Sequence, residues 1–368
     1  MAGEPLLRPS VITSSSILRL PALLEDILST HEGVGFDLMV LRPEDIDWIR
    51  ETDKLPKDDR ITDLVADHDG TVREHLTRWL VNYRAAHPEH RIRVPALATY
   101  FPDISSKTGD RWEKACRAVV NSVKLCRALA AEGFDVTPCV EVVCGSLLEP
   151  VIETGDDRPK LVKEYKRKAK IDRLVETLAE VKTRLAAENP PLGEGDYAIA
   201  LEVEPGSAYV LNDRDALRDV YAAVCAAGLR GVVGLNLDIA HFRIAGITPA
   251  VLAGGVAGYP DLTDWLVHSH IADHPLWMHT RDLSLGAFTQ VERFPTEFCP
   301  YLDVLVRRAK NARAAPGGLR FTNAVALELE GCSRLSWVHE SLVHLKRLLR
   351  EAEKRAAPSP PDSPQNPA

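Results

Sequence analysis

The stretch NAVALELEGCS (residues 323–333) predicts a buried strand that carries two acids on one face. Successive side chains of a strand point to opposite sides, so Glu328 and Glu330 point the same way. The valine and leucines that alternate with them suit a packed hydrophobic layer on the other side. Two neighbouring acids on a core strand require a compensating partner, because a buried unpaired charge costs several kcal/mol.

Polar pairs with the same spacing lie near the ends of three earlier apolar runs. The pairs are Glu202 with Glu204 in residues 197–204, Asn236 with Asp238 in residues 232–240, and His268 with His270 in residues 265–273. In a parallel barrel, the carboxyl ends of the strands meet at one end of the same cavity. The four sets of polar residues are therefore expected to converge.

Strand-like runs alternate with helical segments along the chain, and this alternation predicts the fold. The eight runs are residues 10–15, 34–41, 92–101, 136–144, 197–204, 232–240, 265–273 and 322–330. Apolar residues at three- and four-residue spacing predict helices between them, for example over 110–133. Eight strands, each followed by a helix, predict an α/β fold, a closed (β/α)8 TIM barrel. An open doubly wound sheet would require a glycine-rich first turn, and the sequence contains no G-x-G-x-x-G.

The chain is predicted to form a single barrel domain over residues 10–355. Residues 42–70, 145–160 and 274–298 are longer than ordinary connections, and they follow the second, fourth and seventh expected strands. Long loops at these places are expected to cover the mouth of the barrel. The final stretch, 356–368, is rich in Pro and Ser and is expected to be a disordered tail.

Composition argues against several classes of protein. The chain has 368 residues, of which 45% are apolar and 27% charged, as in ordinary globular proteins. Acids outnumber bases by 53 to 45, which is the wrong sign for gripping a nucleic-acid backbone. Seven scattered cysteines without a C-x-x-C pair indicate reduced thiols and a cytoplasmic location. No signal-peptide pattern and no membrane-spanning run is apparent, so neither nucleic acid nor membrane is expected as a partner.

Two interpretations of the convergent polar residues differ in what balances their charge. On a single strand, a glutamate can pair with an arginine, and a histidine can be an ordinary hydrogen-bonded core residue. Four successive strands with the same arrangement favour a divalent cation held by carboxylates and imidazole. Mixed oxygen and nitrogen ligands suit Mn, Co, Zn, Fe or Mg, so the cofactor is predicted to be one divalent metal ion of undetermined identity.

The ordered motifs ALEVEPG, NLDIAH, HSHIADHP and ALELEG resemble those of the xylose isomerase-like TIM-barrel superfamily. They are most similar to its sugar isomerase and epimerase branch, which includes hydroxypyruvate isomerase and the ketose 3-epimerases. The similarity covers about residues 195–335 and is limited to topology before them. The runs MVLRPED and ATYFPD lack the histidines with which the endonuclease IV group binds extra zinc ions. A three-metal phosphodiesterase is therefore not expected.

The resemblance implies roles for the motif residues. The four metal-ligand positions of the branch fall on Glu202, Asp238, His270 and Glu328. His241 matches the histidine that hydrogen-bonds a substrate oxygen in that branch.

Further substrate contacts are predicted after the seventh strand, where the branch uses an arginine and a Gly-rich turn. The segment RDLSLGAF offers Arg281 and Gly286, but Phe288 stands where a second glycine is usual. This departure suggests that a different end of the substrate is bound. His268 and Asp273 are predicted to contact the substrate together with Arg281.

The predicted function is that of a metal-dependent sugar or keto-sugar isomerase or epimerase. A metal that chelates the carbonyl and adjacent hydroxyl of a small carbohydrate acidifies the C–H between them and stabilises the resulting enediolate. Proton transfer needs a carboxylate on each face of the substrate, and Glu202 and Glu328 are the predicted catalytic pair.

Three alternatives stay open. A keto-polyol dehydratase or lyase would use the same ligands and the same first proton abstraction. A non-catalytic sugar-binding barrel would keep the architecture without the chemistry. A hydride shift would normally require a second metal site, for which the sequence offers Glu204, Glu330, His268 and Asp273.

Barrels of this kind commonly pair through their helices, so the chain is also a candidate homo-oligomer.

Overall fold

Eight parallel strands close into a barrel within the part of the chain that the computed structural model describes. The described residues are 4–13, 20–39, 71–99, 102–105, 109–151, 160–164, 167–275, 282–315, 318–329 and 334–357. The barrel strands are β1 (Arg8–Thr13), β2 (Gly35–Leu38), β4 (Leu97–Thr99), β6 (Cys139–Val143), β9 (Ala198–Glu202), β10 (Val233–Asp238), β11 (Leu266–Ile271) and β12 (Ala324–Leu327). Their order around the ring is β1-β12-β11-β10-β9-β6-β4-β2.

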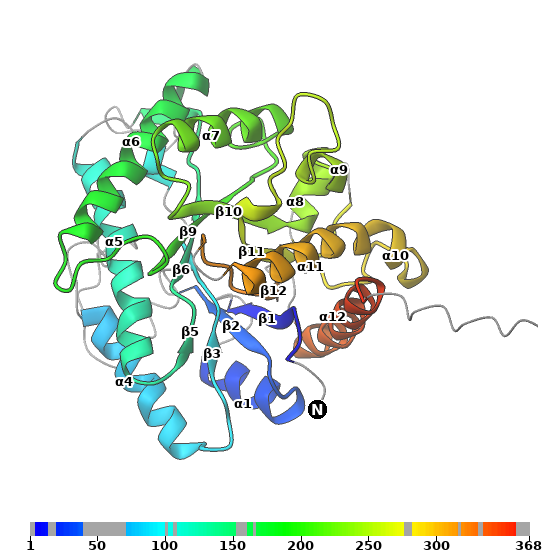
Figure 1. Cartoon of the computed structure of the whole chain (residues 1–368). Coiled ribbons are helices and arrows are strands. Elements are labelled where there is room, and N and C mark those ends of the chain that lie inside the picture. Colours follow the sequence, from blue (N-terminus) through cyan, green and yellow to red (C-terminus); the bar gives the residue numbers. More distant parts are fainter. Residues whose placement is uncertain are drawn as a thin grey trace, which may run out of the picture.

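Helices surround this ring, as Figure 1 shows. The described helices are α1 (Leu20–Thr30), α4 (Thr71–Ala86), α5 (Asp110–Ala131), α6 (Arg167–Ala186), α7 (Arg214–Ala226), α8 (Ile239–Ile244), α9 (Pro249–Leu252), α10 (Phe294–Glu297), α11 (Cys299–Ala314) and α12 (Leu335–Arg355). Short 3-10 turns lie at Pro102–Ser105, Thr263–Trp265 and Val291–Arg293. The predicted (β/α)8 TIM barrel is confirmed.

Local sequence signals account for several helix boundaries. The Asp213 side chain accepts a hydrogen bond from Ala216 N at 2.8 Å and so caps the start of α7. Gly133 follows α5 with a φ of 81°, a backbone conformation that favours glycine, and ends the helix predicted over 110–133. The α12 helix packs one face on the barrel through Val338, Leu342, Leu345 and Leu349, which are buried at four- and three-residue spacing.

The third and fourth predicted strands differ from expectation, because a proline interrupts each. Proline has no N–H to donate to a ladder. Pro95 therefore separates the two-residue strand β3 (Arg93–Val94) from β4, and Pro138 separates β5 (Asp135–Val136) from β6. The strands β3 and β5 pair with each other beside the barrel. A second small sheet, the antiparallel pair β7 (Leu148–Val151) and β8 (Lys160–Glu164), lies in the long segment after β6.

The barrel strands separate two environments. Alternate residues of β9 illustrate this: Ala198 and Ala200 belong to a small apolar cluster with Ala96, Cys139 and Val267, and Glu202 follows them at the same two-residue spacing. Ile199 and Leu201, which lie between them, belong to the large core under the helices. Polar side chains thus begin where the small apolar cluster ends, toward the carboxyl ends of the strands.

Two further expectations concern cysteines and membranes. The six cysteines that the structure describes are free thiols, and five of them are buried. Among the described helices, none combines the length and apolar composition needed to cross a membrane.

Candidate metal centre

The strands β9 to β12 bring four side chains to one point. Glu202 and Asp238 are the last residues of β9 and β10, His270 is the next-to-last residue of β11, and Glu328 directly follows β12. One ligand atom from each lies within 4.8 Å of the other three. All four are buried, and the most exposed, Glu328, is 7% accessible. The structure thus brings together the four residues that the sequence predicts as ligands, and these four are called the Glu202–Glu328 cluster below.

Strand register explains why these residues reach the same level of the barrel. Asn236 lies opposite Glu202 across β10 and β9, and Asp238 lies opposite His270 across β10 and β11. Because side chains alternate along each strand, Asn236 and Asp238 face the same side. Their side chains therefore meet those of Glu202 and His270 inside the ring.

Asp238 shows how the cluster fits a cation. Its Oδ1 accepts a hydrogen bond from His241 N at 2.8 Å, which caps the start of α8. Its Oδ2 is buried and has no hydrogen-bond partner among the described residues. Leaving such an oxygen unpaired in the interior costs free energy that a cation would recover. With carboxylate oxygens and one imidazole nitrogen as donors, the buried cluster fits a divalent metal site.

One ring nitrogen of His270 faces the acids of the cluster. His270 Nδ1 lies 3.0 Å from Glu328 Oε2 and 3.7 Å from Glu202 Oε1. The amide nitrogen of Asn236 lies 3.1 Å from the same ring nitrogen and 3.4 Å from Glu202 Oε1. Asn236 therefore holds His270 and Glu202 relative to each other from the neighbouring strand.

The two glutamates of the cluster have pKa values that diverge. Burial raises the pKa of Glu202, but hydrogen bonds with His270 and Glu141 outweigh it and lower the value to about 2. Burial raises the pKa of Glu328 to about 8, against the opposing effect of His270. The surroundings of the two side chains therefore favour the ionised form of Glu202 and the protonated form of Glu328. A divergent pair of this kind is typical of acid and base partners.

His241 lies beside the cluster on α8. Its Nδ1 is 3.7 Å from Glu202 Oε1 and 4.0 Å from Asp238 Oδ2. Burial opposes a charge on His241, but the carboxylates of Asp238 and Glu204 outweigh it and raise its pKa well above 6.5. A cationic imidazole at this place can donate a hydrogen bond to an oxygen of a bound molecule.

His268, predicted to contact substrate, lies in a different contact network. Its Nε2 is 2.8 Å from Asp37 Oδ2, and its Nδ1 is 2.8 Å from Thr322 Oγ1. Ser10 donates a hydrogen bond to the other oxygen of Asp37 at 3.1 Å. All of these side chains are buried. They form an inner layer between β1, β2 and β11, and the structure does not bring His268 into the Glu202–Glu328 cluster.

Asp273, also predicted to contact substrate, binds the loop that follows β11. Its Oδ2 accepts hydrogen bonds from the backbone N–H groups of Phe288 at 2.8 Å and Thr289 at 2.7 Å. Its Oδ1 accepts one from Thr289 Oγ1 at 2.7 Å. The carboxylate thus folds the loop back over the end of β11. Arg281, the third predicted substrate contact, lies outside the described residues.

The second metal site considered from the sequence is only partly described. Glu330 lies outside the described residues. Glu204 is present and buried, and burial raises its pKa to about 8. His268 instead joins Asp37 and His270 in a second group of nearby ligand atoms.

Sequence reasoning missed two buried acids near His270. Glu141 Oε2 on β6 lies 3.2 Å from His270 Nε2, and Asp37 Oδ2 on β2 lies 3.7 Å from the same nitrogen. Each of these acids stands alone in an apolar run, without the second polar residue two positions away that marks the last four strands. The sequence feature that could have identified them is a single acid at an inward position of a strand otherwise made of apolar residues.

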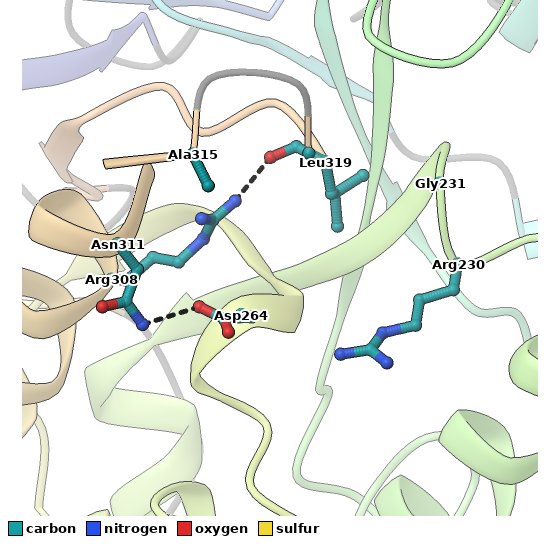
Figure 2. A pocket seen from close by; sticks show the side chains of 8 residues that line it. Arg230, Gly231, Asp264, Arg308, Asn311, Ala315 and Leu319 are labelled. Atoms are coloured by element: carbon teal, nitrogen blue, oxygen red, sulfur yellow. Dashed lines mark hydrogen bonds between the residues drawn. The ribbon is translucent and has the colours of Figure 1, made fainter. Parts of the chain in front are cut away.

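A cavity of about 360 Å³ lies elsewhere, and Figure 2 shows the side chains around it. Its walls include Gly231 and Asp264, which precede β10 and β11, so it lies near the amino ends of these strands. Arg308 donates hydrogen bonds to Leu266 O and Leu319 O, and Asn311 donates to Asp264. Since these donors hold the base of the barrel together, we interpret the cavity as structural and not as the catalytic site.

Comparisons with known proteins agree with this architecture. No protein-family model matches the sequence, and the search of curated proteins found no match. Among solved structures, the chain is similar to the IolI protein with a bound zinc atom, with a TM-score of 0.53 and 16% identity over 95% of this chain and 99% of that one. A xylose isomerase domain protein from Alicyclobacillus acidocaldarius gives a TM-score of 0.55 at 16% identity, covering 94% and 99% of the two chains.

An L-ribulose 3-epimerase is similar to the same extent. Its TM-score is 0.53 at 15% identity, covering 96% of this chain and 100% of that one. These TM-scores are accompanied by low sequence identity, so the similarity shows a shared fold. Over nearly its full length, the chain has the fold of the xylose isomerase-like TIM-barrel proteins.

Proposed function

We propose that the protein is a divalent-metal-dependent isomerase or epimerase of keto-sugars. The observation that carries this proposal is the position of two glutamates on one buried cluster. Glu202 is the last residue of β9, and Glu328 directly follows β12. Two strands, β10 and β11, lie between β9 and β12 around the ring. They therefore approach the cluster from different sides, as removal and return of a proton on two faces of a substrate require.

Four residues would hold the metal: Glu202, Asp238, His270 and Glu328. When bound, a divalent cation would polarise the carbonyl and neighbouring hydroxyl of an α-hydroxy ketone and lower the cost of removing the proton between them. Glu202 is assigned as the base that removes the proton, and Glu328 as the carboxyl group that returns it on the opposite face, because they lie at the ends of strands separated by two others around the ring.

His241 is assigned to the substrate and not to the ion. As a cation beside Glu202, it would hold a substrate oxygen by donating a hydrogen bond while that oxygen gains negative charge. The fold resemblance to an L-ribulose 3-epimerase supports the choice of a keto-sugar, because the name of that protein states a ketose as its substrate.

Solvent deuterium tests the proposal. The metal-loaded protein is incubated with ketopentoses and ketohexoses in deuterated water, and the products are examined by mass spectrometry and NMR. We expect an isomer or epimer that carries one deuterium at the carbon next to the carbonyl. Turnover without deuterium would indicate a hydride shift, and a product that has lost water would indicate a dehydratase; either result would contradict the proposal.

Two matched variants assign the acids. At saturating metal, Glu328→Gln should still exchange the substrate proton with solvent but should release no epimer, because the return on the second face is blocked. Glu202→Gln should do neither in that reaction direction. Identical behaviour of the two variants, with metal content confirmed, would contradict the two-glutamate assignment.

A further inference from the structure

Glu141 is a buried acid on β6 that has no role in the proposed reaction; so far it has appeared through its effect on the pKa of Glu202. It is 3% exposed, and its Cα lies opposite Ala200 of β9, two residues before Glu202. Its neighbours at alternate positions, Cys139 and Val143, are apolar and buried. An acid at such a position needs a partner that recovers the cost of burial.

That partner is the outer nitrogen of His270. Glu141 Oε2 and His270 Nε2 lie 3.2 Å apart, and neither atom has a hydrogen-bond partner among the described residues. The contact is therefore short but lacks the straight N–H···O alignment of a hydrogen bond. Within the part of the chain that the structure describes, Asp37 Oδ2 lies farther from His270 Nε2, at 3.7 Å.

The opposite side of the ring decides which nitrogen carries the proton. The Asn236 amide nitrogen lies 3.1 Å from His270 Nδ1 and can only donate, so Nδ1 is the acceptor in the neutral ring. Nε2 then carries the hydrogen, and among the described residues Glu141 Oε2, at 3.2 Å, is nearer to that nitrogen than Asp37 Oδ2, at 3.7 Å. The lone pair of Nδ1 is left facing Glu202 and Glu328.

We infer that Glu141 is a positioning residue that orients His270 for metal binding by accepting a hydrogen bond from Nε2–H. The inference rests on the proposed metal centre and deepens it. A carboxylate behind a ligating histidine fixes the tautomer and the ring plane and makes the ligating nitrogen a better donor. Glu141 does not ligate the ion; it acts through His270.

Cobalt affinity of the metal-free, full-length protein tests the inference. Replacing Glu141 by Gln keeps an acceptor oxygen but removes the group that can ionise, and Glu141→Leu removes both. Partners behind metal ligands typically contribute about 10- to 100-fold in affinity, so we expect about 10-fold weaker Co²⁺ binding for Gln and about 100-fold for Leu, each with one ion per chain. Circular dichroism and thermal unfolding confirm that each variant is folded.

A spectroscopic measurement separates positioning from a general structural effect. In the Co²⁺-loaded wild type, the Nε2–H proton of His270 should give a strongly shifted, solvent-exchangeable NMR signal that is absent in His270→Gln. The signal should move in Glu141→Gln and should exchange too fast to observe in Glu141→Leu. Asp37→Asn is the matched control: its carboxylate is bonded to His268 and lies 3.7 Å from His270 Nε2, against 3.2 Å for Glu141, so it should move the signal less than Glu141→Gln does.

The outcomes are distinct. Wild-type affinity and an unchanged signal in both Glu141 variants would overturn the inference. Loss of binding in Glu141→Gln as complete as in Glu202→Gln would make Glu141 a ligand and would also overturn it. If the wild type binds no Co²⁺, the metal centre itself fails and the inference fails with it. If Co²⁺ binds as expected but no sugar is turned over, the proposed function fails while the assignment of Glu141 stands.

Discussion

The two oxygens of Asp238 have different tasks, and this allows a clean test of the metal site. Oδ1 caps α8, and Oδ2 is the buried oxygen without a hydrogen-bond partner. Asn is as good a helix cap as Asp, because its side-chain oxygen also accepts the backbone hydrogen bond. Asp238→Asn should therefore keep α8 intact while removing one ligand charge.

We expect Asp238→Asn to bind Mn²⁺ or Co²⁺ much more weakly than the wild type and to lose activity in parallel. Calorimetric titration measures the affinity, and unfolding of the metal-free proteins in urea checks the fold. Similar stability of the two metal-free proteins is the expected control. Wild-type metal affinity in the variant would contradict the assignment of Asp238 as a ligand.

His241 gives the opposite prediction. In His241→Ala, the four cluster residues remain, so the protein should still bind close to one metal ion per chain. Turnover should fall by about 100-fold or more, as is typical when a group that handles protons or developing charge is removed. Elemental analysis and steady-state kinetics measure the two quantities. Loss of the metal together with activity would make His241 part of the metal site.

At the scale of helices, the ion pair between α5 and α6 predicts a pH-dependent contribution to stability. Arg184 donates two hydrogen bonds to the Glu113 carboxylate, at 2.8 and 2.7 Å. These bonds lower the pKa of Glu113 below its ordinary value of 4.5. Because the folded pKa is below the unfolded one, the stabilisation is present above the unfolded pKa and is lost as the pH falls through the folded pKa.

We expect Arg184→Met to lower the free energy of unfolding by about 0.5–1 kcal/mol at pH 7, since the pair is partly solvent-exposed. The difference from the wild type should shrink between pH 5 and the lowest pH at which the protein stays folded. Urea unfolding across this range measures it. Arg173→Met, on the same helix but in an exposed pair with Glu176, is the control and should have the smaller effect. A pH-independent difference would show that packing of the arginine, and not its charge, is responsible.

The whole barrel closes where its first and last strands pair, and Glu353 reinforces that closure. β1 pairs with β12 on one side and with β2 on the other. Just before β1, the backbone N–H groups of Leu6 and Leu7 donate to Glu353 Oε1 of α12, at 2.6 and 2.9 Å. The last helix thus holds the start of the chain by a charge-assisted pair of hydrogen bonds.

Glu353→Ala should lower the free energy of unfolding by about 1–3 kcal/mol, because two backbone donors lose a charged acceptor. Glu353→Gln should have a smaller effect, since its amide oxygen can still accept. Thermal and urea unfolding measure both. The neighbouring exposed residue supplies the control, Lys354→Ala, which should stay within about 0.5 kcal/mol of the wild type. Equal effects of Ala and Gln would indicate that the charge alone matters.

Local patterns determine much of this molecule. The alternation of strands and helices predicts the barrel, and α5 (Asp110–Ala131) corresponds to the helix that apolar spacing predicts over 110–133. Polar residues at alternate positions of β9 to β12 predict which side chains face inward, and the structure brings Glu202, Asp238 and His270 together with Glu328. These inferences succeed because the alternation of side chains along a strand is a property of neighbouring residues.

Only the tertiary structure decides the rest of the site. Glu141 and Asp37 each stand alone in their strands, and nothing near them in sequence marks them as neighbours of His270. Closure of the ring brings Asp37 of β2 and Glu141 of β6 close to the His270 side chain of β11, although neither β2 nor β6 pairs with β11. Asp273 is likewise used by the backbone of a loop that folds back from residues 286–289. Local alternation sets which side of a strand a residue faces, whereas which residues it meets across the barrel depends on closure and register, and these are properties of the whole chain.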